Sequence, residues 1–487
     1  MRVTTRKAAM LAVYGVVCAT SMAPAVRAQE GPPAPSASVE KGVVARRKLP
    51  TLTPGPSITL AEALERAESR NLGMEAARLE IDKARAQLKQ AWGLVLPVIQ
   101  GGMQYTRMDH EDTLDLAGSM APLLQAMGIT LPPGAAEPML LNPQDKLDAT
   151  LQAGLSVVNA KSWFTINAAQ AGVEFAELSV KDGQRRLLLG VAQAYYMALM
   201  ARELIDLYTA QVEAAEAQVA VARARLSAEA GRRIDVVRAE TDLEKVYQDL
   251  ISAHLAFDNA RDAIGSLTGT PGLPLPQHGP SFVPPDGTEA QLADRAGSRR
   301  TDIRAGRAKV TLQENLLDAV WMQFLPTLSA GWRGSYQFTQ MPDMGSQDRS
   351  RWAFVLSLTV PIYDQFRYGD LDYKRAALQQ ATVELKNIED KASLAVRNSA
   401  RDYDAALLSI ETAERQAALA GEGLALAESA YKAGAATSLD VTEARRGHTS
   451  ASVNLATLRL RAQIALLTLL DAVGDDLLPP SRARPED

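Results

Sequence analysis

Two long stretches without proline constrain the fold of this chain more than any other feature. Proline is absent from Lys161 to Thr270 and again from Ile362 to Leu478. Because proline breaks the interior of a helix, both stretches can hold helices well beyond the usual length of about 8–20 residues. Apolar residues within them recur at alternating steps of three and four residues: Leu188, Val191, Tyr195 and Ala198, then Val396, Ala400, Tyr403, Leu407 and Ile410. This spacing predicts long, coiled-coil-like antiparallel helices.

The chain also repeats itself. Four residues recur 229 positions further along in the same order: Ala67, Arg78, Trp92 and Pro97 match Ala296, Arg307, Trp321 and Pro326. A second match, Asp235-Val236 with Asp440-Val441, has an offset of 205 residues. A register held over such a distance predicts two tandem structural repeats, at 57–270 and 288–478. A proline-rich linker at 271–287 joins them, and 479–487 is a C-terminal tail.

Each repeat is expected to run helix, strand, loop or turn, strand, very long helix, turn, helix. Alternating or extended patterns place strands at about 97–107, 148–158, 326–338 and 351–362. In the last of these, Trp352, Phe354, Leu356 and Leu358 alternate with smaller or more polar residues. The predicted class is therefore mainly α with a small β part.

Length arithmetic suggests how the helices pack. At about 1.5 Å per residue, helices over 163–229 and 370–433 would each span roughly 100 Å. The shorter predicted helices add up to the same length in pairs, 235–267 with 288–325 and 440–473 with 58–95. We therefore expect each long helix to lie beside two shorter ones stacked end to end.

The N-terminus predicts export from the cytoplasm. Arg2, Arg6 and Lys7 precede an apolar stretch, and Val26-Arg27-Ala28 resembles a cleavage site, so residues 1–28 form a predicted signal peptide. Lipidation of Cys18 is an alternative, but Val17 is larger than the residue that usually precedes a lipidated cysteine. Residues 29–56 form a proline-rich lead.

Composition excludes several classes of function. The chain has 52 basic and 57 acidic residues, which gives no basic face for nucleic acid. One cysteine and four scattered histidines offer no metal-ligand spacing, and no catalytic or phosphate-binding motif is present, so we expect neither an enzyme nor a cofactor. Methionines in the loop from Met108 to Lys146 could suggest copper export. Packing is the simpler explanation, and no metal site is predicted.

The four predicted strands have the length of tilted transmembrane strands, about 9–11 residues. Four strands cannot close a barrel, and their open edges would leave backbone groups unpaired in lipid. Outer-membrane barrels begin at about eight strands. If the strands enter a membrane, the chain must oligomerise, and two or three copies would supply 8 or 12 strands.

The whole chain after the signal peptide resembles the TolC-like outer-membrane efflux proteins. The signatures of the first half are Leu60-Ala61-Glu62-Ala63-Leu64 with Ala67 and Asn71, Ala84-Arg85-Ala86-Gln87, and Leu96-Pro97. Those of the second half are Leu325-Pro326-Thr327-Leu328, Leu358-Thr359-Val360-Pro361-Ile362, Tyr431-Lys432-Ala433-Gly434 and Leu439-Asp440-Val441.

The resemblance implies a homotrimer in the outer membrane of a Gram-negative-type cell. Its 12-stranded β-barrel would lie in lipid and its α-barrel in the periplasm. It also implies a passive channel-tunnel of a tripartite efflux or type I secretion system. Its partners would be a periplasmic adaptor (membrane fusion protein) and an inner-membrane pump of the RND, ABC or MFS type.

The resemblance also implies roles for residues at the periplasmic tips. Asp440 and Glu443 match acids that line the tunnel entrance and select cations; a helix N-cap is the alternative role for Asp440. Asp235 and Tyr431 match a latch between helices, but its basic residue is replaced by Ala436, and Arg232 or Arg233 could substitute. The small residues expected to contact the adaptor are Ala230, Gly231, Ala433, Gly434 and Ala435.

Two other classes of protein would have a similar helical pattern. A periplasmic helical adaptor or scaffold would lack a barrel and fractionate as a soluble protein. A secreted enzyme with a helical shell would need a buried catalytic cluster, which the sequence does not indicate.

Overall fold

The computed structural model of the chain describes residues 52–128, 139–277, 279–280, 282–339 and 348–476. Thr51–Asp487 form one compact unit. The predicted signal peptide at 1–28, most of the lead at 29–56, most of the turn near Met341 to Asp348 and the tail at 479–487 lie outside the described residues.

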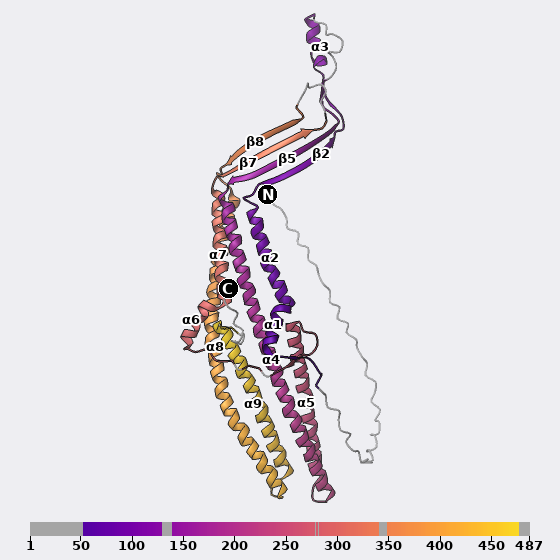
Figure 1. Cartoon of the computed structure of the whole chain (residues 1–487), viewed down its shortest axis with the longest axis vertical. Helices are drawn as coiled ribbons and strands as arrows, with labels where there is room; N and C mark the ends of the chain where they lie inside the picture. Colours follow the sequence, from indigo (N-terminus) through magenta and orange to yellow (C-terminus); the bar gives the residue numbers. More distant parts are fainter. Residues whose placement is uncertain (1–51, 129–138, 278, 281, 340–347, 477–487) are drawn as a thin grey trace, which may run out of the picture. The chain divides into compact units, whose positions relative to one another are not determined.

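Eight of the described helices, labelled in Figure 1, form four pairs of equal length. Helices α1 (Leu60–Arg70) and α6 (Glu289–Arg299) have 11 residues each, and α2 (Leu72–Trp92) and α7 (Thr301–Trp321) have 21 each. Helices α4 (Ala160–Ser227) and α8 (Gln365–Lys432) have 68 residues each, and α5 (Arg233–Thr268) and α9 (Ser438–Val473) have 36 each. The first residues of the two shorter pairs are 229 positions apart, and those of the two longer pairs are 205 positions apart. These are the offsets of the sequence matches.

The helices expected to run unbroken over 58–95 and 288–325 are interrupted, so that expectation was wrong. Asn71 and Arg300 both have extended backbone and separate α1 from α2 and α6 from α7. The Asn71 side chain accepts a hydrogen bond from the Met74 amide at 3.2 Å and donates to the Leu267 carbonyl at 2.9 Å. Side-chain hydrogen bonds of this kind satisfy helix ends without proline or glycine.

Four long strands form one antiparallel sheet in the order β2-β5-β7-β8, side by side in Figure 1. The strands are β2 (Val98–Arg107), β5 (Asp145–Val158), β7 (Thr327–Gln337) and β8 (Ser350–Thr359). The edge strands β2 and β8 each have one strand partner, and among the described residues no strand pairs with their outer sides. Smaller elements lie in the loops: a parallel pair of β1 (Ser57–Ile58) with β6 (Leu275–Pro276), and an antiparallel pair of β3 (Asp112–Leu114) with β4 (Met139–Asn142). Helix α3 (Leu116–Ala126) and the 3-10 turn η1 (Met322–Phe324) complete the list.

The stacking expected from length arithmetic is only half right. Helix α4 packs along α5 and α7, as expected. Helix α8 packs along α9 and α7, and not substantially along the segment 58–95 of its own chain. The end of α9 instead meets the joint between α6 and α7, where the Arg300 side chain donates to the Ala472 carbonyl at 3.2 Å. The end of α5 meets the joint between α1 and α2 in the same way, through Asn71.

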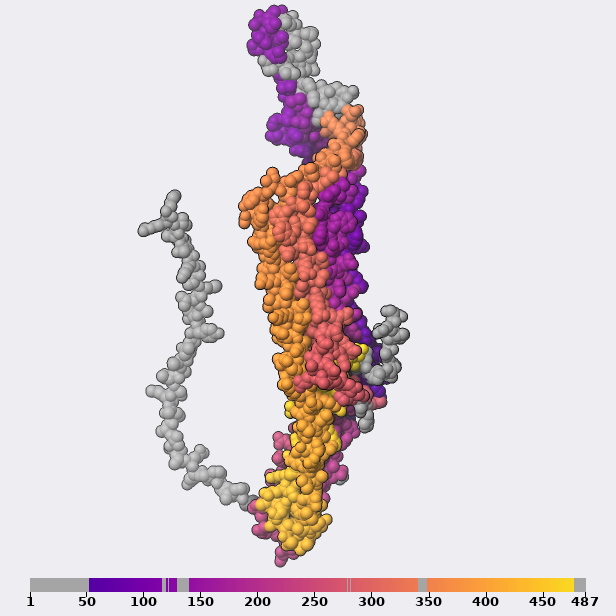
Figure 2. All heavy atoms as spheres, turned by 90° about the vertical axis from the view of Figure 1, so that its left-hand side faces the viewer, coloured from indigo at the N-terminus to yellow at the C-terminus, as the bar shows by residue number. Residues whose placement is uncertain are grey.

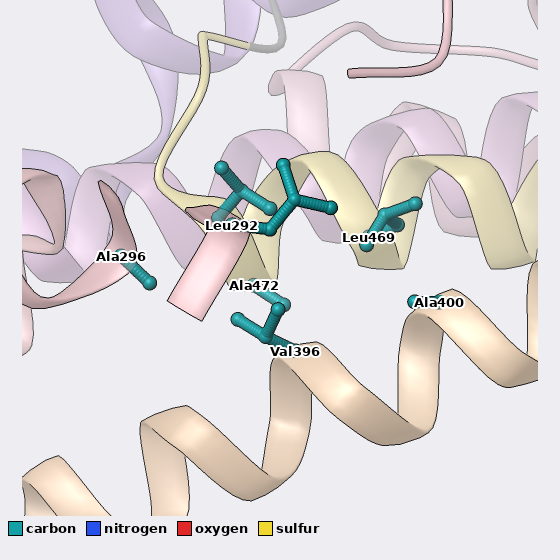
Figure 3. Packing of buried hydrophobic residues seen from close by; sticks show 7 residues of the cluster. Leu292, Ala296, Val396, Ala400, Leu469 and Ala472 are labelled. Atoms are coloured by element: carbon teal, nitrogen blue, oxygen red, sulfur yellow. The ribbon is translucent and has the colours of Figure 1, made fainter. Parts of the chain in front are cut away.

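Small apolar residues let the helices approach closely where they meet. One cluster joins α6, α8 and α9 through Leu292, Ala296, Val396, Ala400, Leu469, Ala472 and Val473 (Figure 3). Five of the seven are smaller than leucine, which suits a narrow gap between helices. An 18-residue stretch of α9 is long and apolar enough, by length and composition, to cross a membrane. We assign its apolar C-terminal half to this helical core, because Leu467, Leu470 and Val473 are buried there.

Candidate functional site

The two faces of the sheet differ sharply in chemistry. Antiparallel partners share a face, so the strand register sorts the side chains. One face is uncharged over most of its height and is here called the charge-free face; from β2 to β8 it comprises Ile99, Gly101, Met103, Tyr105, Leu147, Ala149, Leu151, Ala153, Leu155, Leu328, Ala330, Trp332, Gly334, Tyr336, Trp352, Phe354, Leu356 and Leu358. Beyond Tyr105 and Leu147, at the outer end, the same alternation ends in the paired residues Arg107 and Asp145. The opposite face has Gln100, Gln104, Lys146, Asp148, Gln152, Arg333, Arg351 and several hydroxyl residues. This is the alternation expected of strands with lipid on one side and water on the other.

Aromatic side chains lie at both ends of the sheet. Tyr105, Tyr336 and Trp352 occupy the charge-free face near the turns between strands. At the other end, Trp92 and Trp163 pack edge to face with ring centroids 6.1 Å apart, and Phe324 contacts Tyr368 at 5.3 Å. Aromatic side chains at both borders of an apolar band are typical of a membrane-spanning barrel wall.

The far end of the long helices carries the residues predicted for the tunnel entrance. Asp440 and Glu443 both lie near the start of α9, one turn apart, and both are exposed. The alternative prediction, that Asp440 is the N-cap of this helix, was wrong. The N-cap is Thr437, and Asp440 is the third helical residue of a capping box, with its Oδ2 accepting hydrogen bonds from the Thr437 amide and hydroxyl at 2.7 Å each. Hydrogen bonds from the Thr437 amide and then its hydroxyl hold the pKa of Asp440 below the ordinary value of 3.8, so its carboxylate is ionised at neutral pH.

The two tip turns have the same backbone but different residues. Glu229 and Gly434 occupy equivalent positions, with φ of 56° and 78°. Glycine adopts this left-handed conformation readily, whereas a glutamate is strained in it. At Gly231 the space is tight, because a Cβ there would lie 3.0 Å from the Cβ of Arg225 and would need a small local shift. The other small tip residues, Ala230, Ala433 and Ala435, are exposed.

The residues predicted for a latch are not in contact with each other through any described ion pair. A side-chain oxygen of Asp235 lies 3.7 Å from Arg232, the N-cap of the same helix, and within the described part of the chain no ion pair involves Arg233. Tyr431 is buried, and its ring lies under the guanidinium of Arg225 at 3.9 Å from the centroid. Arg225 also donates to the Tyr431 carbonyl at 2.9 Å, which joins the end of α4 to the end of α8.

Sequence reasoning missed Arg225, because its contact pairs residues 206 positions apart that match no motif. A second missed contact lies nearby. Arg446 of α9 binds the buried Asp242 of α5 at 2.6 Å. Both links join the α4–α5 hairpin to the α8–α9 hairpin, and a search for arginines facing acids or aromatic residues at equivalent levels of the two hairpins could have suggested them.

The methionines considered as possible copper ligands lie in the outer loop and next to it. Among the described residues, no group of three or more histidine, cysteine or acidic side chains is placed to hold a metal ion. Met103 lies in β2, and Met120 and Met127 are exposed in or next to α3.

A family model for outer membrane efflux proteins matches residues 63–270 and 292–475, which together make up most of the chain. This chain belongs to the outer membrane efflux protein family. The efflux protein is 25% identical to the outer membrane protein OprJ of Pseudomonas aeruginosa over 94% of its own length and 93% of that relative. It is 22% identical to the outer membrane protein TolC of Vibrio cholerae, over 68% of its own length and 77% of that protein. Its fold matches the Campylobacter jejuni CmeC outer membrane channel with a TM-score of 0.72, at 18% identity and 85% coverage of each chain.

Family and fold together place this efflux protein in the outer membrane, with its helical part in the periplasm. The described architecture agrees with that location. The charge-free face belongs to the strands, while the long helices α4, α5, α8 and α9 have charged residues along their exposed sides.

Proposed function

We propose that the protein is the outer-membrane channel-tunnel of a tripartite efflux or type I secretion system. Three copies would complete a 12-stranded barrel in lipid and an α-barrel in the periplasm. The observation that carries this proposal is the charge-free face on a sheet with two open edges. An open edge in lipid leaves backbone groups without hydrogen bonds, and joining β8 of one copy to β2 of the next removes every edge.

A second surface supports association between copies. Helix α8 is uncovered along much of its length (Figure 2). Val383, Leu394, Leu408, Leu419 and Leu426 are 49% to 68% exposed on it. At 100° per residue these five lie within about 40° of one another around the helix, so they form one apolar stripe. We assign the stripe to contact with α2 and α5 of the next copy, which expose Leu79, Ile251 and Leu255.

Equal helix lengths at the offsets of 229 and 205 residues support an origin by duplication. Six structurally similar units would then surround the tunnel of a trimer. In this arrangement a passive conduit needs no catalytic residue and no cofactor. An inner-membrane pump supplies the energy, and its class, RND, ABC or MFS, determines the substrate.

We propose that the tips have three roles. Three copies of Asp440 and Glu443 form an acidic ring that admits cations and cationic substrates preferentially. The turns at Ala230-Gly231 and Ala433-Gly434-Ala435 contact the periplasmic adaptor, where small exposed residues permit close approach. Arg225 replaces the base missing at Ala436 and, with Tyr431 and Asp235, holds the closed tip.

The alternative of a periplasmic adaptor without a barrel is not favoured. A charge-free sheet face of four strands would be a large exposed apolar patch on such a protein, which soluble monomers avoid. An enzyme is likewise not favoured by the channels among the matched structures.

Reconstitution of the full chain in planar bilayers tests the proposal. We expect discrete, cation-selective conductance steps from a species that migrates as a trimer in detergent. Recovery of the protein in the soluble periplasmic fraction, or a detergent-independent monomer without conductance, would contradict it.

A further inference from the structure

The hairpin between β2 and β5 continues well beyond the sheet. The Met108 amide donates to the Gln144 carbonyl at 2.8 Å, directly after the last paired residues of the sheet. Strands β3 and β4 then pair, and the Asn142 side chain donates to Asp112 Oδ2 at 3.1 Å. These bonds make the β3–β4 pair an ordered stem, and α3 follows β3 directly at the outer end of this stem.

Helix α3 has an apolar side without a partner. It has 11 residues, none of them charged. Met120 and Leu123, together with Met127 just after the helix, are spaced by three and four residues on one side and are 46%, 58% and 65% exposed. Among the described residues, α3 makes no substantial contact with any other helix or strand.

Such a helix requires a partner to be stable. Helices shorter than about 12–15 residues are marginal in water on their own. Pro122 lies inside α3, so the helix also lacks one of its backbone hydrogen bonds. We therefore expect the side with Met120 and Leu123, here called the α3 seam, to be covered in the assembled protein.

Charge and size favour further copies of α3 as the partner. The base of the stem is acidic, with Asp109, Glu111, Asp112 and Asp115, which disfavours docking on an anionic membrane surface. A closed barrel of 12 strands spaced about 4.8 Å apart and tilted about 40° has a diameter of roughly 24 Å. Three helices packed about 9 Å apart make a cluster roughly 20–22 Å wide. The cluster therefore matches the mouth of the barrel.

We propose that three α3 helices pack through the α3 seam around the trimer axis and form an apolar plug over the outer mouth of the barrel. The proposal rests on the proposed trimeric channel. Each stem supplies one helix, and the seam spacing of three and four residues is that of helices in a bundle.

Cross-linking in intact cells tests the contact directly. Cys18 is the only cysteine of the chain and lies in the predicted signal peptide, so the exported protein offers a cysteine-free background. With Leu123→Cys and a short bismaleimide, we expect covalent dimers. Gln125→Cys is the matched control, since this exposed position lies about 200° around the helix and should give none. Absence of dimers with Leu123→Cys overturns the proposal.

Conductance tests the plug. We expect Leu123→Asp to raise single-channel conductance severalfold, because three carboxylates repel one another and hydrate the seam. Val283→Asp, an exposed apolar position in the linker, should leave it unchanged. A trimer with unaltered conductance in Leu123→Asp overturns the plug while leaving the channel intact. Absence of conductance in wild type and variant alike would instead defeat the proposed function itself.

Discussion

The first and second halves of the chain have helices of the same lengths in the same order, and they differ in the outer loop and in the tip turns. Helices of 11, 21, 68 and 36 residues occur in the same order in both. Yet the first half carries the long β3–α3–β4 excursion between its strands, while its counterpart joins β7 to β8 over the short segment 338–349. At the other end, the first tip turn contains Glu229 and the second Gly434.

The helices, which maintain the fold, have the same lengths in both halves, whereas the tip turns and the outer loop, where we expect specific functions, differ. Changing the length of a 68-residue helix would shift every contact along it, so the helix lengths tolerate little divergence. Turn and loop residues contact few neighbours and can diverge freely. If two similar halves form each subunit, specialised roles are expected at the tips and the outer loop, where the halves differ.

The largest expected effect concerns the four-stranded sheet, where substitutions in the two halves should have the same result. Ala153 and Phe354 lie at the same level of the sheet, each paired with Trp332, one from each half. Arginine at either position would face lipid and cost about 2–4 kcal/mol near the middle of the bilayer. We expect both Ala153→Arg and Phe354→Arg to abolish the trimer in outer-membrane fractions, measured by its heat-sensitive migration on gels.

Val355→Arg is the control for that pair, because its side chain lies on the opposite face next to Gly331. Trimer yield near wild type is expected for this variant. Equal loss from Val355→Arg and Phe354→Arg would mean that the two faces are not lipid and lumen.

The second effect should distinguish the halves. Asp235 and Asp440 are 205 positions apart and equivalent in the repeat, but Asp440 is exposed while the side chain of Asp235 is 16% exposed. We expect Asp440→Asn to lower cation selectivity severalfold, with a further loss on adding Glu443→Gln. Asp235→Asn should alter the open fraction and leave selectivity unchanged. Reversal potentials in a KCl gradient provide the measurement, and loss of selectivity in Asp235→Asn alone would contradict the assignment.

The selectivity should also depend on pH in a defined direction. The pKa of Asp440 lies below 3.8 because its carboxylate accepts hydrogen bonds from Thr437. Any stability from this carboxylate is therefore present above pH 3.8 and is lost as the pH falls through the lowered pKa. In a Glu443→Gln background, cation selectivity should remain constant from pH 8 to pH 5. A midpoint near pH 6 would contradict this cause.

The sequence predicted the strands and long helices well because each has a strong periodic signal. Trp352 to Leu358 alternate in the sequence, and this alternation places them on one face of β8. The breaks at Asn71 and Arg300 could not be predicted, since side-chain hydrogen bonds to distant carbonyls stabilise them. Helix α3 was also missed, because an 11-residue apolar segment containing Pro122 has no helical signal in a loop.

The tip residues were predicted less completely. Resemblance singled out Asp440 and Glu443 by local motifs, and both are exposed near the start of α9. Their role at a tunnel entrance stays a prediction. The contact between Arg225 and Tyr431 depends on how two hairpins approach each other, which no local pattern specifies. A comparison of the two halves does not predict this contact either, because the residue of the second half that is equivalent to Arg225 is Ala430.

A smaller effect is expected from breaking this contact between the halves. Arg225→Ala removes a stacked cation and a hydrogen bond to the Tyr431 carbonyl, each worth about 1 kcal/mol. Every 1.4 kcal/mol removed from the closed state raises the ratio of open to closed tips about tenfold. We expect a higher open fraction in single-channel records of Arg225→Ala. Arg225→Lys, which keeps the charge without the planar stack, should lie in between; an unchanged open fraction in both would exclude a latch.

The smallest effect concerns the backbone of the two turns and should have opposite signs in the two halves. Glu229 and Gly434 share a left-handed conformation that costs a residue with a side chain about 1 kcal/mol. Glu229→Gly should therefore raise the melting temperature slightly, and Gly434→Ala should lower it by a similar amount. No atom would contact a Cβ added at Gly434, so its loss of stability would come from backbone strain alone. Paired thermal scans of the purified trimer measure both shifts. Weaker adaptor binding by the more stable Glu229→Gly would mean that the strained carboxylate is retained for recognition, whereas unaltered binding would leave the strain as a tolerated divergence between the halves.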